Sequence, residues 1–194
     1  MENINFDYEI IRDTKHSLRL TVSQNGKITV RAPIYVSDSE IEDFVLSKKS
    51  RIESRLKKSE YLKGEAQRLG ILSADDVNEL KKKALEVIGE RTRYFADMLG
   101  VTYGKVSVKC QKTRWGSCSS MGNLNFNYLL MLAPKEVLDS VIVHELCHRK
   151  YMNHSKIFYE EVLRICPNYK ACSDWLKENG KILFIRGGAE SEKL

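Results

Sequence analysis

The segment from Val143 to His148 carries the residue types of a catalytic metal site at a regular spacing. It reads Val-His-Glu-Leu-Cys-His, so His144 and His148 lie four residues apart and Glu145 stands between them. On a helix, residues four apart lie one above the other, which lets two imidazoles bind one metal ion. Glu145 is turned by about 100° from His144. It can therefore reach a water on the metal as a general base rather than serve as a ligand.

A third histidine, His154, follows six residues after His148. A continuous helix would turn it about 120° away from the metal-binding face, so we expect the helix to break between them. Asn153 tolerates the left-handed conformation that often ends a helix, and Ser155 can cap the next one. Three imidazoles leave a fourth coordination position open, as in catalytic zinc sites. The sequence therefore predicts one Zn²⁺ per chain, held by His144, His148 and His154.

Neighbouring residues offer alternatives for these roles. Glu160 and Glu161 could supply the third ligand, because some zinc hydrolases use two histidines and one glutamate. Cys147, three residues after His144, is expected to be a small buried side chain rather than a ligand. Ordinary packed or surface histidines on an amphipathic helix are the competing interpretation. The spacing, the adjacent Glu145 and the expected helix break all count against it.

A second motif lies upstream of the histidines. The chain reads Arg-Trp-Gly-Ser-Cys-Ser at 114–119, and Asn123, Leu124 and Asn127 follow. Together with Val-His-Glu-Leu at 143–146 and Asn-His-Ser at 153–155, this pattern resembles the YgjP-like metallopeptidase family. That family is a zincin-like group related to the WLM and SprT metalloproteases. The resemblance covers nearly the whole chain.

The resemblance implies that His144, His148 and His154 bind zinc and that Glu145 is the catalytic acid and base. It also implies an α+β fold whose metallopeptidase domain begins near residue 70, with the HExxH helix packed on a small antiparallel or mixed sheet. The spacing of the third histidine is also that of the metzincins. Their helix-breaking glycine corresponds here to Tyr151, however, and no later Met-turn follows, so a metzincin is not expected.

The first functional hypothesis is a cytoplasmic zinc metallopeptidase that cuts peptides or proteins. Glu145 would take a proton from the zinc-bound water and later deliver it to the leaving amine. An edge strand ending near Trp115, or the strand at 124–130, is expected to pair with extended substrate. Trp115 itself could contact substrate or simply pack in the core. The candidate donors to the oxyanion are Arg114, Tyr128, Tyr151 and Tyr159.

The charge pattern leaves two further hypotheses open. No Asp or Glu occurs between Met98 and Lys135, where four cations fall: Lys105, Lys109, Lys112 and Arg114. If this stretch borders the metal, an acidic peptide, a polyphosphate or a protein held on nucleic acid would suit it; solvated lysines are the alternative. One hypothesis is a pyrophosphatase-type hydrolase of nucleoside triphosphates, although the chain lacks a P-loop or an acidic Mg²⁺ site. The other is a nucleic-acid-associated protease, which would bind DNA with a steep salt dependence.

The elements before the site form an N-terminal portion, 1–66, with strands and one helix. Alternating apolar residues predict strands at 4–10, 18–22 and from 28 to Pro33, with Asn-Gly at 25–26 turning a hairpin. Ser37 and Glu40 have capping-box spacing, and the helix after them carries apolar residues at 41, 44, 45 and 52. The Lys- and Arg-rich stretch at 48–63 is interpreted as a solvated helix face.

The metallopeptidase domain is predicted at 67–186, after a linker at 64–70. A helix capped by Ser73 is expected to run to about residue 99 and to stop at Gly100. A strand at 106–108, a Gly/Ser-rich turn at 116–122 and a strand at 124–130 come next. Helices follow at 135–152 and 156–165, and a last one holds Trp175. The tail, 187–194, is expected to be flexible.

Composition sets the outer limits. The 194 residues are 42% apolar and 30% charged, as in soluble globular proteins, and the net charge of +6 is too mild to indicate an anionic partner by itself. No secretory signal is visible, and the apolar runs are too short to span a bilayer. None of the five cysteines forms a CxxC pair. We therefore expect a cytoplasmic protein with reduced thiols and no membrane association.

Overall fold

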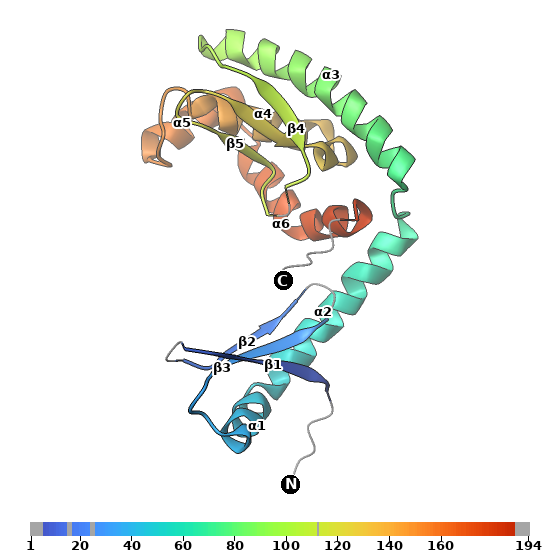
Figure 1. The fold of residues 1–194 in the computed structure, drawn as a ribbon. Coiled ribbons are helices and arrows are strands. Elements are labelled where there is room, and N and C mark those ends of the chain that lie inside the picture. Colours follow the sequence, from blue (N-terminus) through green and yellow to red (C-terminus); the bar gives the residue numbers. More distant parts are fainter. Residues whose placement is uncertain (1–5, 15–16, 24–25, 112, 189–194) are drawn as a thin grey trace. The chain divides into compact units, whose positions relative to one another are not determined.

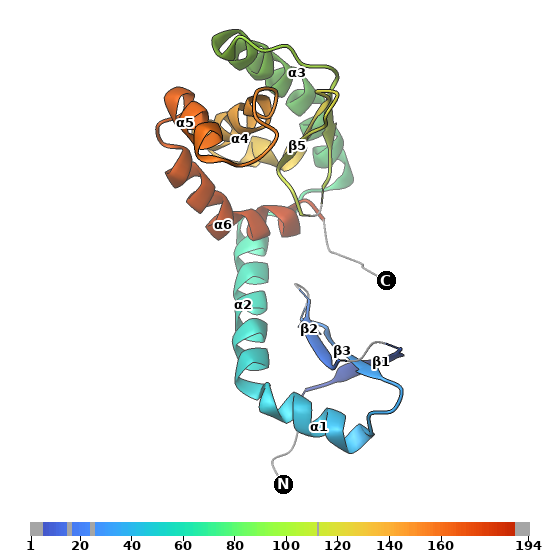
Figure 2. The ribbon, with the colours of Figure 1, turned by 90° about the vertical axis from the view of Figure 1, so that its left-hand side faces the viewer.

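The computed structural model describes residues 6–14, 17–23, 26–111 and 113–188, and Figures 1 and 2 show the chain from two sides. The chain divides into two compact units, one up to Arg68 and one from Leu69 to Ala189. The observed elements are mixed α and β, which confirms the predicted α+β class. Among the described residues, no helix combines the length and the hydrophobicity that crossing a bilayer would require.

The first unit contains a three-stranded sheet and two helices. Strands β1 (Tyr8–Asp13), β2 (Arg19–Val22) and β3 (Ile28–Pro33) lie in the order β1-β3-β2, with β1 parallel and β2 antiparallel to β3. The hairpin between β2 and β3 is therefore confirmed, although residues 24 and 25 of its turn lie outside the described residues. Residues 4 and 5 of the first predicted strand also lie outside them.

The predicted single helix of this unit is in fact two helices. Helix α1 (Asp38–Ser47) begins at the expected capping box of Ser37 and Glu40, and α2 (Lys49–Arg68) starts after a break at Lys48. Apolar residues from both helices enter one small core against the sheet. Helix α2 continues through Gly64, so the predicted linker at 64–70 is wrong for its first five residues.

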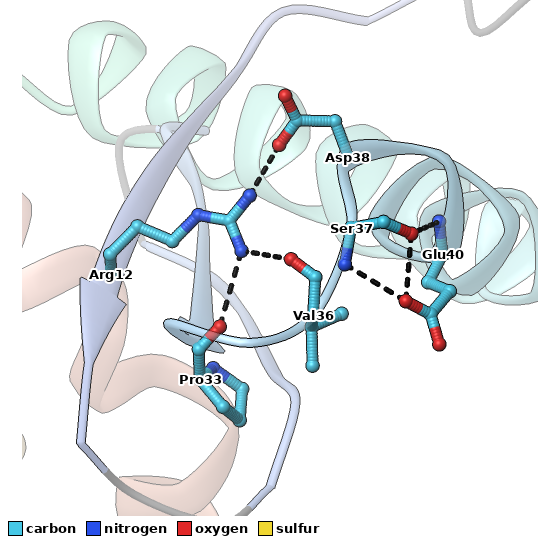
Figure 3. A network of polar contacts seen from close by, with 6 residues as sticks. All are labelled: Arg12, Pro33, Val36, Ser37, Asp38 and Glu40. Carbon is cyan, nitrogen blue, oxygen red and sulfur yellow. Dashed lines mark hydrogen bonds and ion pairs between the residues drawn. The ribbon is translucent and has the colours of Figure 1, made fainter.

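A polar network fixes the entry into α1, as Figure 3 shows. The Arg12 guanidinium on β1 donates to the Pro33 carbonyl at 3.1 Å, to the Val36 carbonyl, and to the Asp38 carboxylate. One side chain thus satisfies two backbone carbonyls and pairs with an acid in the first turn of α1. Such a carboxylate is also favourable there because of the helix dipole.

The second unit begins with the long helix α3 (Ala74–Leu99), whose bounds match the prediction. Ser73 and Asp76 form the capping box, and Gly100 ends the helix with a φ of 64°, a left-handed conformation that glycine adopts at little cost. Helix α3 packs on α4 (Lys135–Cys147). The Arg91 guanidinium joins the two through paired bonds of 2.8 and 2.7 Å to the Asp139 carboxylate.

The sheet of this unit is small and mixed. Strands β4 (Val106–Lys109), β5 (Gly116–Cys118) and β6 (Leu124–Asn127) lie in the order β4-β6-β5, with β4 parallel and β5 antiparallel to β6. The start of the predicted turn at 116–122 is thus the strand β5. The predicted strand at 124–130 ends at Asn127, and a 3₁₀ helix, η1 (Tyr128–Leu132), follows it.

Helix α4, which carries the HExxH motif, packs against β5, α5 (Lys156–Ile165) and α6 (Tyr169–Arg186). Figure 2 shows these three helices grouped beside β5. Placement of the motif helix on a small mixed sheet is as predicted. The bounds of α5 are also confirmed, but α4 ends at Cys147 rather than at residue 152. Residues 189–194 of the predicted tail lie outside the described residues.

Candidate metal centre

Helix α4 presents His144 and His148 on one face at its C-terminal end. Their ring centroids are 5.0 Å apart, and His148 forms the C-cap of the helix. Most of α4 is buried because it lies between other elements of the unit, and Leu146 and Cys147 are fully buried. Cys147 is therefore the core residue that the sequence predicted. Its burial raises the pKa of the thiol to about 12, which disfavours the thiolate that binds metals.

The chain reverses between His148 and His154. The backbone amides of Lys150 and Tyr151 both donate to the Cys147 carbonyl at 3.0 Å, which closes the helix. The side chain of Ser155 then caps α5, as predicted. The expected left-handed residue near 153 is not found, because no described residue other than glycine has a positive φ. The helix break itself is present and brings the third histidine back to the first two.

The three histidines form a cluster suited to one metal ion. Ligand nitrogens of His144, His148 and His154 all lie within 4.8 Å of one another. The Nε2 atoms of His144 and His154 are 3.1 Å apart. Two imidazoles bound at about 2.0–2.1 Å to a tetrahedral zinc ion would have nitrogens about 3.3 Å apart. The separation of the His144 and His154 nitrogens is therefore close to that of two ligands of one zinc ion.

Hydrogen bonds on the opposite ring nitrogens leave the metal-facing nitrogens available. Nδ1 of His148 lies 3.0 Å from the Tyr151 carbonyl oxygen, and Nδ1 of His144 lies 2.8 Å from the Tyr169 hydroxyl. A carbonyl accepts only from an N–H, so the His148 Nε2 is free of hydrogen when that ring is neutral. Contacts of this kind orient imidazole ligands and fix their tautomer.

Phe158 on α5 lies among the three imidazole rings. It is fully buried, and its ring centroid lies 4.9, 4.7 and 5.0 Å from those of His144, His148 and His154. A rigid aromatic ring at this position limits how far the imidazoles can turn. It also contributes to the low polarity around them.

Burial and mutual proximity keep His144 and His148 neutral. Desolvation, together with the neighbouring His148 and His154, lowers the pKa of His144 to about 4. Desolvation also lowers the pKa of His148. Both rings are thus unprotonated near pH 7, which is the form that binds metal.

Glu145 is not part of the ligand cluster and is buried beside β5. An added Cβ at Gly116 would lie 2.7 Å from the Glu145 Cγ and Oε1, so only glycine leaves room for this side chain. Burial raises the pKa of Glu145 to about 7, against the opposing effects of the Arg114 charge and a hydrogen bond from the Cys118 backbone. A carboxyl group with a pKa near neutral can both accept and return a proton at physiological pH.

A cavity of about 390 Å³ adjoins His144 and Glu145. Of the predicted substrate residues, Arg114 and Trp115 line it.

The predicted tyrosines do not line this cavity. Tyr151 has its ring half-buried against the core, and its carbonyl oxygen lies 3.0 Å from Nδ1 of His148. Tyr159 is 40% exposed, with its ring 6.1 Å from that of His154. The remaining candidate, Tyr128, is wrong: it is 2% exposed and its hydroxyl donates to the Gly187 carbonyl, so it cannot reach a substrate.

The predicted edge strand, basic stretch and alternative metal ligands also differ from the structure. The strand β6 is central in its sheet, so residues 124–127 provide no edge, whereas among the described strands only β6 pairs with β5, which leaves the other edge of β5 free. Lys109 lies on β4, which β6 separates from β5, and Lys112 lies outside the described residues. Among the described cations of the predicted basic stretch, only Arg114 lines the cavity. Glu160 and Glu161 are paired with lysine or arginine side chains and are not part of the histidine cluster.

Several residues of the site were not predicted from the sequence, among them Phe158, Tyr169 and Lys177. Phe158 could have been suspected, because it lies four residues after His154 on the apolar face of a helix. Tyr169 and Lys177 gave no such signal. They come from α6, a separate helix that only the tertiary fold brings to the histidines.

The family model for the YgjP-like metallopeptidase domain matches residues 16–75 and 76–179. No curated protein matches the chain. Among solved structures, the metallopeptidase zymogen abylysin of Pyrococcus abyssi is 23% identical over 48% of this chain and 93% of that chain, with a TM-score of 0.43. The metallopeptidase zymogen jannalysin of Methanocaldococcus jannaschii is 24% identical over 40% and 79% of the two chains, with a TM-score of 0.37.

Proposed function

The chain belongs to the YgjP-like metallopeptidase family and is a hydrolase of peptides or proteins, and on this basis we propose that its metal is one zinc ion per chain, held by His144, His148 and His154. The cluster of three imidazole nitrogens carries this proposal. Nitrogen donors without a thiolate suit a catalytic zinc site, whose fourth position stays open. When bound, zinc would act as a Lewis acid towards the carbonyl and would lower the pKa of water towards about 7.

Glu145 is proposed as the general base. Its carboxyl group lies next to a ligand histidine in sequence but outside the ligand cluster. The Cys118 backbone and the space left by Gly116 hold it in place. Near pH 7 it would take a proton from the attacking water and then pass that proton to the leaving amine. Such a base contributes about 10²- to 10⁴-fold to the rate.

The free edge of β5 is proposed as the binding surface for the substrate backbone. The amide of Ser119 and the carbonyl of Trp115 bond to the β6 side of the ladder. Because the bonding direction alternates along a strand, Gly116 and Cys118 direct their backbone groups towards the free edge. An extended peptide could pair there with the Gly116 groups and would pass directly beside Glu145.

A reducing compartment such as the cytoplasm is proposed as the site of action, because all five cysteines have free thiols. Nucleotides and nucleic acids are not included in the proposal. The matching family model describes a metallopeptidase domain, and within the described residues no acidic group able to hold Mg²⁺ accompanies the three histidines.

Metal analysis together with a peptide-library assay tests the proposal. Purified protein should hold about one zinc per chain, and the Glu145→Gln variant should keep that zinc while losing at least about 100-fold in hydrolysis. Glu160→Gln is the matched control, since Glu160 is an exposed acid paired with Lys156. Full activity in Glu145→Gln would rule out the proposed base, and a zinc-free active protein would rule out the metal assignment.

A further inference from the structure

The cavity beside the metal centre lies between one face of α4 and one face of α6. Helix α4 contributes Ser140, Val141, His144 and Glu145, at spacings of one turn. Helix α6 contributes the side chains at 169, 173, 176 and 177, again on one face. Residues 113–116, which lead into β5, close the third side. A volume of about 390 Å³ is within the range of small-ligand pockets.

A rigid aromatic wall defines one side of this cavity. The Trp115 indole is stacked on the Phe184 ring, with centroids 4.5 Å apart and an interplanar angle of 22°. It lies so close to α6 that a Cβ added at Gly180 would be 2.7 Å from its Cζ2. Leu176 and Val141 add apolar surface. The aliphatic part of a substrate side chain would find apolar contact here.

The polar rim of the cavity is cationic. Two of its residues, Arg114 and Lys177, carry positive charge, and both are exposed. Lys177 is paired with Asp174 at 2.7 Å, whereas the Arg114 side chain has no ion pair among the described residues. Glu145 is the one carboxylate among the described residues of the lining; it is buried beside β5, within range of the Arg114 charge. An unpaired guanidinium is a strong partner for a carboxylate, because it can donate two parallel hydrogen bonds.

We propose that this cavity selects a substrate residue bearing a carboxylate, next to the bond that is cut, with the carboxylate on Arg114 and its aliphatic part on Trp115 and Leu176. The inference rests on the proposed peptidase function and names its substrate class. The carboxylate has two sources in peptides: an Asp or Glu side chain, or the C-terminus of the chain. Both offer the same chemistry to Arg114, and the experiment separates them.

The test measures kcat/KM for peptides that differ only in the residue next to the cleaved bond. Peptides with Glu at this position should be cut about tenfold faster than those with Gln, and the ratio should shrink in high salt. A pair of peptides ending in a free carboxylate or an amide, with no acidic residue, tests the second source. A preference in either pair supports the inference and identifies the source of the carboxylate.

Three variants localise the effect. Arg114→Gln should bring the Glu to Gln ratio close to one, and Lys177→Gln should reduce it less, because Lys177 already has a partner. Lys109→Gln, which removes the same charge from β4 outside the cavity, should leave the ratio unchanged. Since the ratio compares two substrates on one enzyme, a general loss of rate in Arg114→Gln cancels.

Each outcome gives a decision. If peptides are cut but neither pair of peptides shows a preference for the carboxylate, this inference is overturned and the peptidase proposal stands. The same holds if the preference survives in Arg114→Gln. If none of the library peptides is cut by the zinc-loaded protein, the peptidase proposal fails and the inference fails with it.

Discussion

Replacing Tyr169 by Phe should weaken zinc binding without removing a ligand. The Tyr169 hydroxyl lies 2.8 Å from Nδ1 of His144, and the two rings are stacked with an interplanar angle of 12°. Phe keeps the ring and removes only the hydroxyl. With Nε2 directed at the metal, the Nδ1–H of His144 would lose its acceptor in a largely buried site.

The expected size follows from this lost bond. An unsatisfied buried donor costs about 1–3 kcal/mol, and loss of a partner to a metal-binding histidine typically costs 10- to 100-fold in affinity. The zinc dissociation constant of Tyr169→Phe should therefore rise about 10- to 100-fold. Burial raises the pKa of Tyr169 to about 12, so the hydroxyl stays neutral through the working pH range and the effect should not vary with pH there.

Competition with a chromophoric chelator measures this constant directly and needs no substrate. Tyr159→Phe is the matched control: its ring lies 6.1 Å from that of His154, and among the described residues its hydroxyl has no hydrogen-bond partner. An unchanged zinc affinity in Tyr169→Phe would refute the positioning role. Equal weakening in both variants would refute it too, since a general effect of removing a tyrosine hydroxyl would then explain the result.

Three other perturbations have defined outcomes. Gly116→Ala should displace Glu145 and reduce kcat/KM by at least about tenfold, while metal analysis should find the zinc retained. Gly89→Ala is the control at an open helical position, and it should raise the free energy of unfolding by about 0.5–1 kcal/mol. Phe158→Ala should lower the unfolding free energy by about 3–5 kcal/mol in urea titrations, and a loss below 1 kcal/mol would contradict its central packing. Hydrogen bonds and ion pairs lower the pKa of Glu161 to about 2, below its ordinary value, so its stabilisation is present above about pH 4.5 and lost as the pH falls towards 2. Glu161→Gln should therefore cost about 1–2 kcal/mol at pH 7, discounted because its partners are partly exposed, and about a quarter of that at pH 2.5. A pH-independent cost would argue against this ion pairing.

Local features of the chain were predicted well because neighbouring residues determine them. The capping boxes at Ser37 and Ser73 and the cap at Ser155 all form between residues three apart. The spacing of His144 and His148 likewise fixes their common face on any helix. These signals placed α3 and α5 correctly.

Features that depend on distant contacts were predicted poorly. Tyr128 was a plausible substrate residue in a strand, but the chain turns into a 3₁₀ helix there and buries its ring in the core. The strand β6 looked like an edge, yet β4 and β5 pair on either side of it. Alternation of apolar residues indicates a strand but does not give its neighbours. The contribution of α6 through Tyr169 and Lys177 was missed for the same reason.

The segment Arg114–Cys118 connects the chemistry to the recognition of substrate. Gly116 leaves the space that Glu145 fills, and the Cys118 backbone opposes the rise in that carboxyl group's pKa. The two residues before Gly116 line the cavity, one as a cation and one as an aromatic wall. Because side chains and backbone bonds alternate along a strand, a shift of one residue would remove all of these relations together. Geometry thus accounts for the motif at 114–119 under the two proposals: one short strand would position the base, the backbone of the substrate and the side chain beside the cleaved bond.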